Sequence, residues 1–126
     1  MNGYMISTGD RPGLAARLFD AAAARGVNVF PAYGLADGTT GLIVVGSDDE
    51  AGLQAAIADA GLSATPIEMV VTEIENRPGT GATLFRKLSD AGVNLRVAVP
   101  IGMSAESVQI ALGASDPALL KRALGV

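Results

Sequence analysis

Residues 10–19 read Asp-Arg-Pro-Gly-Leu-Ala-Ala-Arg-Leu-Phe, and the segment Gly-Val-Asn-Val follows at residues 26–29. The chain repeats this pattern at residues 76–85, Asn-Arg-Pro-Gly-Thr-Gly-Ala-Thr-Leu-Phe, which lead to Gly-Val-Asn-Leu at residues 92–95. Aligned without gaps, residues 10–29 and 76–95 share nine identities in 20 positions. Repetition at a fixed distance indicates two copies of one supersecondary unit.

The length of the chain, 126 residues, leaves about 60 residues for each copy. A unit of about 60 residues buries only about 60% of the surface of its unfolded chain, so it is marginally stable alone. We therefore expect two small domains, residues 1–69 and 70–126, which pack on each other or on another chain.

The composition excludes several classes of function. Histidine and cysteine are both absent, which rules out disulfides, thiolate metal sites and the common Ser–His and Cys–His nucleophile pairs. We expect no metal, no cofactor and no enzymatic activity. The net charge is −4 without a basic stripe, so a nucleic-acid partner is not expected. Apolar runs are too short to cross a bilayer, and residues 1–6 lack a charged signal-peptide region. A cytoplasmic protein without a membrane partner is the expectation.

Hydrophobic periodicity and turn residues predict the elements of the first copy. A strand at 4–7 leads to a helix that Asp10 caps and Gly26 ends, with Leu14 and Leu18 in its apolar stripe. Proline makes the strand at 27–35 an edge strand. An Asp-Gly turn at 37–38 joins this strand to a central strand at 42–45. A second helix, capped by Asp48, ends at Gly61.

Residues 65–75 change their apolar phase. Ile67, Met69 and Val71 alternate on one phase, whereas Val70 and Ile74 occupy the other. A one-residue shift exchanges the two faces of a strand. We therefore expect one long strand that serves two cores, as the last strand of copy one and the first strand of copy two.

The second copy follows the same order. A helix is expected at 79–91, strands at 95–101 and 108–112, and a last helix after Asp116-Pro117. The prediction is an α+β protein of two ferredoxin-like βαββαβ repeats, with antiparallel sheets and helices on one face. The second repeat lacks its last strand, and the open position offers a route to dimerisation by strand addition.

Arg-Pro-Gly at the first strand-to-helix turn, followed by Gly-Val-Asn-Val or Gly-Val-Asn-Leu, resembles the signature of ACT domains. Both copies carry it, so the whole chain resembles a tandem ACT protein. The resemblance implies a regulatory module that binds an amino acid or a similar small effector near the interface between ACT repeats. It also implies side-by-side pairing through the second strand, and hence a homodimer. The site residues that we infer are Asp10, Arg11, Pro12, Gly13, Leu14, Asn28, Asn76, Arg77, Gly79, Thr80 and Asn94.

The physical chemistry of the motif agrees with an effector site. A helix N-terminus has free N–H groups and the positive end of the helix dipole, which suit a carboxylate. Asp10 can accept a hydrogen bond from an ammonium group. If the copies pair about a pseudo-twofold axis, Asn28 should face the Asn76–Thr80 turn, and Asn94 the Asp10–Leu14 turn. Thr80-Gly81 replaces Leu14-Ala15, so the two sites need not bind equally.

Other interpretations of the same residues stay open. Pro-Gly before a helix also serves as turn and N-cap chemistry alone, and each asparagine can simply bond local backbone. The glycines at 79 and 81 lack the rest of a phosphate-binding fingerprint. An acylphosphatase-like enzyme and an RNA-binding sheet fit the residues less well. The main alternative is a ligand-free module with the ACT fold that pairs with a protein partner.

Overall fold

The computed structural model describes residues 1–9 and 12–126 of the chain. By its contacts the chain divides into two units. The N-terminal unit comprises residues Asn2–Ile67, and the C-terminal unit comprises residues Glu68–Val126 together with Met1. One strand, β4 (Thr65–Glu75), begins in the first unit and ends in the second.

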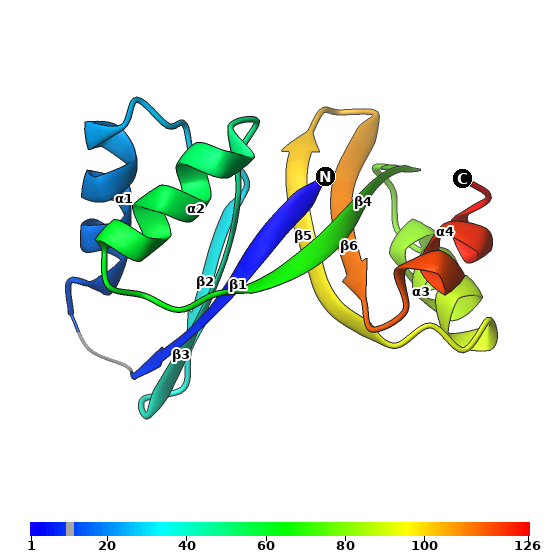
Figure 1. Cartoon of the computed structure of the whole chain (residues 1–126). Coiled ribbons are helices and arrows are strands. Elements are labelled where there is room, and N and C mark those ends of the chain that lie inside the picture. Colours follow the sequence, from blue (N-terminus) through cyan, green and yellow to red (C-terminus); the bar gives the residue numbers. More distant parts are fainter. Residues whose placement is uncertain (10–11) are drawn as a thin grey trace. The chain divides into compact units, whose positions relative to one another are not determined.

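The N-terminal unit has the order strand, helix, strand, strand, helix, strand. Its elements before β4 are β1 (Asn2–Gly9), α1 (Leu14–Ala24), β2 (Ala32–Ala36), β3 (Thr40–Gly46) and α2 (Glu50–Asp59). The strand order is β2-β3-β1, with β4 next to β1, and the β1–β3 and β2–β3 pairs are antiparallel. Both helices lie on one side of these strands (Figure 1). The predicted central position of residues 42–45, in β3, is confirmed.

Aliphatic side chains from β1, α1 and α2 form the core of this unit. Ile6, Leu18 and Leu53 are fully buried there, and Tyr4 packs against the same cluster. Burying a leucine or isoleucine side chain stabilises a fold by about 1.5–3 kcal/mol. The helical stripe that was predicted from Leu14 and Leu18 therefore faces the sheet.

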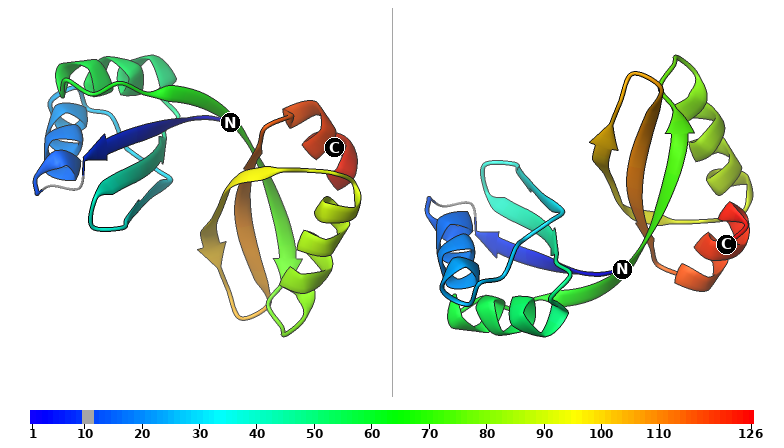
Figure 2. Two further views of the ribbon diagram at one scale, coloured as in Figure 1. Left: turned by 90° about the horizontal axis from the view of Figure 1, so that it is seen from below. Right: turned by 90° about the horizontal axis from the view of Figure 1, so that it is seen from above.

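The C-terminal unit repeats the first elements of this order. After β4 come α3 (Thr80–Asp90), β5 (Leu95–Met103), β6 (Ser107–Ala114) and α4 (Pro117–Leu124). The strand order is β4-β6-β5 and both pairs are antiparallel. Again both helices cover one face (Figure 2). Leu84, Leu88, Leu112 and Leu120 form a core of their own. Element α4 is the last one in the described part of the chain.

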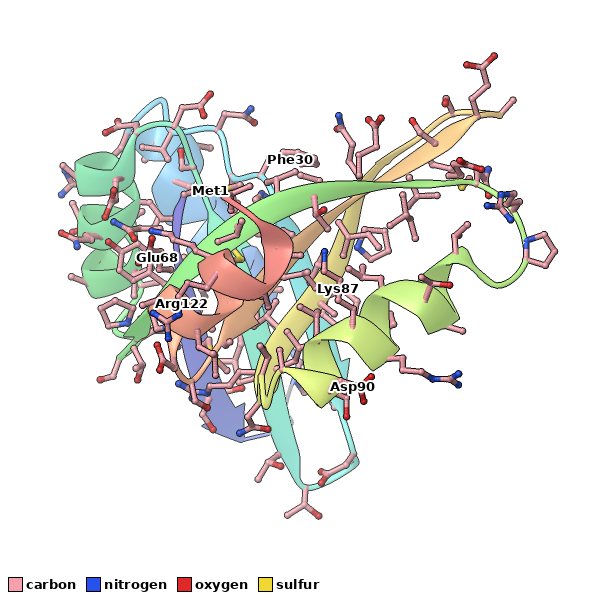
Figure 3. All side chains as sticks on the ribbon, turned by 90° about the vertical axis from the view of Figure 1, so that its right-hand side faces the viewer. Met1, Phe30, Glu68, Lys87, Asp90 and Arg122 are labelled. Carbon is pink, nitrogen blue, oxygen red and sulfur yellow. The ribbon has the colours of Figure 1, made fainter. Side chains whose placement is uncertain are left out.

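The phase change in β4 is confirmed. Ile67 and Met69 are buried on one phase, whereas Val70 and Ile74, on the other phase, pack against the core of the C-terminal unit. Val71, which returns to the first phase, is 43% exposed. Figure 3 shows Glu68 of β4 beside α4, where the Lys121 ammonium pairs with the Glu68 carboxylate.

Two local predictions were wrong. The second strand begins at Ala32 instead of Val27, because the Val27 N–H donates to the Ala22 carbonyl at 2.9 Å and closes the end of α1. The N-cap of α2 is Asp49 instead of Asp48, since the Asp49 carboxylate accepts from the Gly52 N–H at 2.9 Å.

Of the other predicted helix ends, three are confirmed and one is not tested. The helix ends at Gly26 and Gly61 are confirmed, and so is the start of the last helix at Asp116-Pro117, where Asp116 is the N-cap. The proposed cap Asp10 lies outside the described residues, and Gly13 occupies the N-cap position of α1 without a side-chain hydrogen bond.

No helix within the described residues has the length and apolar character that a bilayer crossing needs.

Candidate functional site

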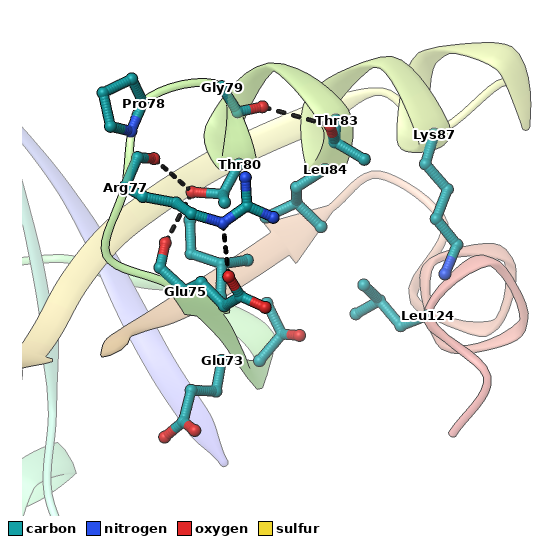
Figure 4. Close-up of a pocket in the computed structure, with 12 residues that line it drawn as sticks. Glu73, Glu75, Arg77, Pro78, Gly79, Thr80, Thr83, Leu84, Lys87 and Leu124 are labelled. Carbon is teal, nitrogen blue, oxygen red and sulfur yellow. Dashed lines mark hydrogen bonds and ion pairs between the residues drawn. The ribbon is translucent and has the colours of Figure 1, made fainter. Parts of the chain in front are cut away.

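A groove of about 560 Å³ opens in the C-terminal unit beside the N-terminus of α3 (Figure 4). Its walls come from three elements: the second half of β4, the first two turns of α3 and the end of α4. The lining residues are Thr72, Glu73, Ile74, Glu75, Arg77, Pro78, Gly79, Thr80, Thr83, Leu84, Lys87 and Leu124. The volume is in the usual range for small-molecule sites.

The turn before α3 presents backbone N–H groups at the rim of this groove. Gly79, at the N-cap, has a φ of 93°, a left-handed conformation that favours glycine. No described residue accepts a hydrogen bond from the N–H of Gly79, Gly81 or Ala82. The positive end of the α3 dipole is at the same place. The corner therefore has the donors and the field that bind a carboxylate.

Hydroxyl groups fix the shape of this corner. The Thr80 hydroxyl donates to the backbone carbonyls of Glu75, at 2.6 Å, and Arg77, at 3.0 Å. The Thr83 hydroxyl donates to the Gly79 carbonyl at 3.1 Å. These bonds tie the end of β4 to the first turn of α3, so the free N–H groups are held in one arrangement.

Charges of both signs line the groove. The Arg77 guanidinium forms an ion pair with the Glu75 carboxylate, and both side chains are largely exposed. Such a pair contributes little to stability. Lys87 forms no ion pair with any residue that the structure describes. Figure 4 shows Lys87 and Leu124 across the groove from Arg77. The Gln109 side-chain amide donates to the Glu73 carboxylate at 3.5 Å, so this carboxylate lies on the sheet face away from α3 and α4.

The corresponding corner of the N-terminal unit has different chemistry. Residues there are related to the second copy by a shift of 66 positions. A smaller groove of about 290 Å³ is lined by Thr8, Gly9, Leu14, Ala15, Gly34, Leu35, Ala36, Gly41, Leu42 and Ile43, none of them charged. Gly9 stands where the second copy has Glu75, and Leu14 where it has Thr80. In the described residues, the two corners share the left-handed glycine before the helix and differ in the polarity of the side chains that line them.

The structure brings three of the inferred site residues together in the second copy: Arg77, Gly79 and Thr80 line the larger groove. Asn76 does not line this groove: its side-chain amide donates to the Ser104 carbonyl at 2.8 Å, and it lines an adjacent groove together with Glu75 and Arg77. The Asn94 side chain donates to the Ser115 hydroxyl at 3.2 Å, beyond the opposite end of α3.

In the first copy, Gly13 has a φ of 91° at the N-cap of α1, and Leu14 lines the smaller groove. Pro12 is in the turn before α1, and Asp10 and Arg11 lie outside the described residues. Asn28 is exposed, and its backbone carbonyl accepts from the Ser47 hydroxyl at 2.7 Å.

Within one copy the asparagine and the turn cannot meet. Each helix has 11 residues and thus spans about 16 Å. The asparagine follows the C-terminal end of its helix, whereas the turn precedes the N-terminal end. That an asparagine of one copy faces the turn of the other stays a prediction.

Sequence reasoning missed several residues of the larger groove: Glu73, Glu75, Thr83, Lys87 and Leu124. Helical spacing could have found two of them, because Thr83 and Lys87 lie three and seven positions after Thr80 and so share its face. Strand alternation could have placed Glu73 and Glu75 together. Nothing in the sequence indicates Leu124, which reaches the groove through tertiary packing.

Metal ligation finds no support in the geometry. Among the residues that the structure describes, no group of three or more acidic side chains gathers to hold an ion.

Comparisons with known proteins give structural matches only. No protein-family model and no curated protein sequence matches the chain. Protein BT0572 from Bacteroides thetaiotaomicron has a similar solved structure, with a TM-score of 0.83 and 15% identity; the match covers 98% of this chain and 85% of that one.

Regulatory domains of aspartate kinase are also similar. The regulatory subunit from Thermus thermophilus matches with a TM-score of 0.64 and 22% identity, over 98% of this chain and 89% of that one. The C-terminal regulatory domain from Porphyromonas gingivalis matches with a TM-score of 0.60 and 19% identity, over 98% and 86%. The chain thus has the fold of aspartate kinase regulatory domains, which are tandem ACT domains, and the resemblance seen in its two Arg-Pro-Gly turns is confirmed at the level of the fold.

Proposed function

We propose that the chain is a regulatory module that binds a small effector, an amino acid by class, and has no catalytic activity of its own. The fold supports a regulatory role, because the similar solved structures include regulatory subunits of aspartate kinase. The regulated activity belongs to a protein partner, since an effector acts by changing the balance between states of such a partner.

The groove beside α3 carries this proposal. Its free N–H groups and helix dipole suit the α-carboxylate of an amino acid, and the Glu75 carboxylate at its rim suits the α-ammonium group. Leu84 and Leu124 offer an apolar surface to the side chain. A zwitterion with an apolar part matches all three features. We place the effector in the second copy, because the described residues that line the corner of the first copy are uncharged.

The proposal includes a homodimer that pairs through β2. Among the residues that the structure describes, this strand is bonded on one side only, to β3. Its apolar residues Tyr33 and Leu35 are 48% and 66% exposed, and Phe30 just before it is 56% exposed. Exposed apolar side chains beside an unpaired strand edge favour association. Sedimentation of the parent chain and of Leu35→Asp measures the pairing.

Thermal shift and calorimetry with the 20 amino acids test effector binding. A ligand at 100 times its Kd adds about 2.7 kcal/mol to the stability of the folded state, which is readily seen in the melting temperature. The carboxamide of a binding amino acid should lose most of its affinity, because it offers no anion to the α3 corner. Lys87→Ala should weaken binding, whereas Arg86→Ala, an exposed neighbour outside the groove, should not.

Asn28→Ala tests whether an asparagine of the first copy contributes to the site. If it does, the variant loses effector binding and keeps its apo melting temperature within a few degrees. Equal loss of apo stability would assign Asn28 a purely structural role.

A flat response to all 20 amino acids in both assays would contradict the effector proposal. The remaining function would be that of a ligand-free interaction module with this fold.

A further inference from the structure

The edge of β4 that faces away from β6 offers unpaired backbone groups. Met1 and Met69 exchange two backbone hydrogen bonds, of 3.0 and 2.7 Å, as an antiparallel bonded pair does. On the opposite edge, the Asn76 N–H donates to the Glu106 carbonyl of the β6 side at 2.9 Å. Because bonding direction alternates along a strand, Val71 and Glu73 point their N–H and C=O groups to the same edge as Met69.

These groups have no partner strand within the described part of the chain. The strand order places only β1 on this side of β4, and Met1 is the last residue on that side to bond with it. The Glu75 carbonyl already accepts from the Arg77 N–H and the Thr80 hydroxyl. The open edge therefore consists of Val71, Glu73 and the N–H of Glu75.

The first copy shows what occupies the corresponding edge. There the first strand is β1, and the strand on its outer side is β4 itself. A shift of 66 positions equates Val71 and Glu73 with Met5 and Ser7 of β1. In the second copy the same place is the groove between β4, α3 and α4, beside the open edge. The first copy therefore indicates that a strand fits at this edge of β4.

The surroundings define the chemistry of the strand that fits. The phase of β4 that faces the helices carries Ile74, and Leu84 and Leu124 complete that wall, so aliphatic side chains are needed on this phase. The other phase carries Glu73 and Glu75, which favour basic side chains opposite them.

We propose that this edge of β4 accepts an extended segment of another protein, with aliphatic residues toward α3 and basic residues on the other face. Main-chain hydrogen bonds to Val71 and Glu73 supply the affinity, and the alternating side chains supply the specificity. The proposal does not rest on effector binding, because peptide and amino-acid titrations measure the two separately.

Fluorescence anisotropy with the full chain tests strand addition. The probe is a labelled peptide, acetyl-Lys-Val-Lys-Ile-Lys-Val-amide, and its counterpart has Glu at every Lys. We expect the basic peptide to bind at least tenfold more tightly than the acidic one, and Glu73→Lys to reverse that order. N-methylation of the amides that face β4 should abolish binding, whereas N-methylation of the alternate amides should not.

A proline variant tests the edge from the side of the protein. Glu73→Pro removes an N–H that the β4–β6 ladder does not use, so the fold should persist by circular dichroism while peptide binding is lost. Thr72→Pro is the destabilising counterpart, because the Thr72 N–H points toward β6, where Thr72 pairs with Ile110. If Glu73→Pro fails to fold, binding of the N-methylated peptides to the parent chain still tests strand addition at this edge.

Three results would overturn the proposal. One is binding that is insensitive to the position of the N-methyl group. Another is an unchanged peptide preference in Glu73→Lys. The third is self-association of the chain that Glu73→Pro abolishes, without peptide binding, because a second copy would then be the occupant.

Discussion

Replacing Gly81 by alanine should stabilise the protein and weaken effector binding. Gly81 lies in the first turn of α3, and a Cβ built on it meets no atom within 4 Å. Glycine costs a helix about 1 kcal/mol relative to alanine, and part of that gain comes from the less flexible unfolded chain. The melting temperature should therefore rise by roughly 3–6 °C.

The two effects of Gly81→Ala separate stability from function. Its N–H is one of the free donors at the N-terminus of α3, and we expect a methyl group beside it to hinder a carboxylate bound there. Guanidinium unfolding measures the first effect, and titration with the effector measures the second. Gly79→Ala is the matched control, because its φ of 93° makes alanine unfavourable by about 1–2 kcal/mol.

A neutral or destabilising result for Gly81→Ala would refute this reasoning. It would mean that the first turn of α3 does not form as the structure shows. Greater stability with unchanged effector affinity would place the effector away from this corner, while leaving the fold argument intact.

Three further predictions concern stability. Asp49→Ala should cost about 1 kcal/mol, since it removes the N-cap of α2, whereas Asp48→Ala should cost almost nothing; denaturant titration of both variants checks the corrected cap. Leu88→Ala and Leu18→Ala should each lower the free energy of unfolding by about 2–5 kcal/mol, because both leucines are almost fully buried, at 1% and 0% exposed. Similar losses in the two variants would show that the two cores contribute equally to stability. The Lys121 ammonium lowers the pKa of Glu68, so the stability from this pair is present above the ordinary value of 4.5 and is lost as the pH falls through the lower, folded-state pKa; Glu68→Gln should flatten that part of the acid unfolding curve.

Much of the fold follows from local patterns. The β4 segment was delimited correctly because its phase change occurs at Val70–Val71, where a strand must exchange its faces. Turn chemistry located the helix ends at Gly26 and Gly61. The start of β2 was missed because the Val27 N–H is used by α1, a local bond at the helix end that alternation does not reveal.

The candidate site was only half accessible to sequence reasoning. The motif located the α3 corner with Arg77, Gly79 and Thr80, since motifs identify backbone features such as a helix N-terminus. The lining of the groove depends on which side chains of β4 and α4 reach it. That information lies in strand pairing and helix packing, so Leu124 had no local signal.

Comparison of the two copies separates residues that shape the backbone from residues that supply chemistry. Gly13 and Gly79 have nearly the same φ, 91° and 93°, so the glycine that the two turns share is explained by its backbone conformation. The differences carry the functional information. Glu75 and Thr80 replace Gly9 and Leu14 on equivalent backbone, and the fold does not require these polar groups because the first copy forms without them. A role for the second corner in binding explains why they are there.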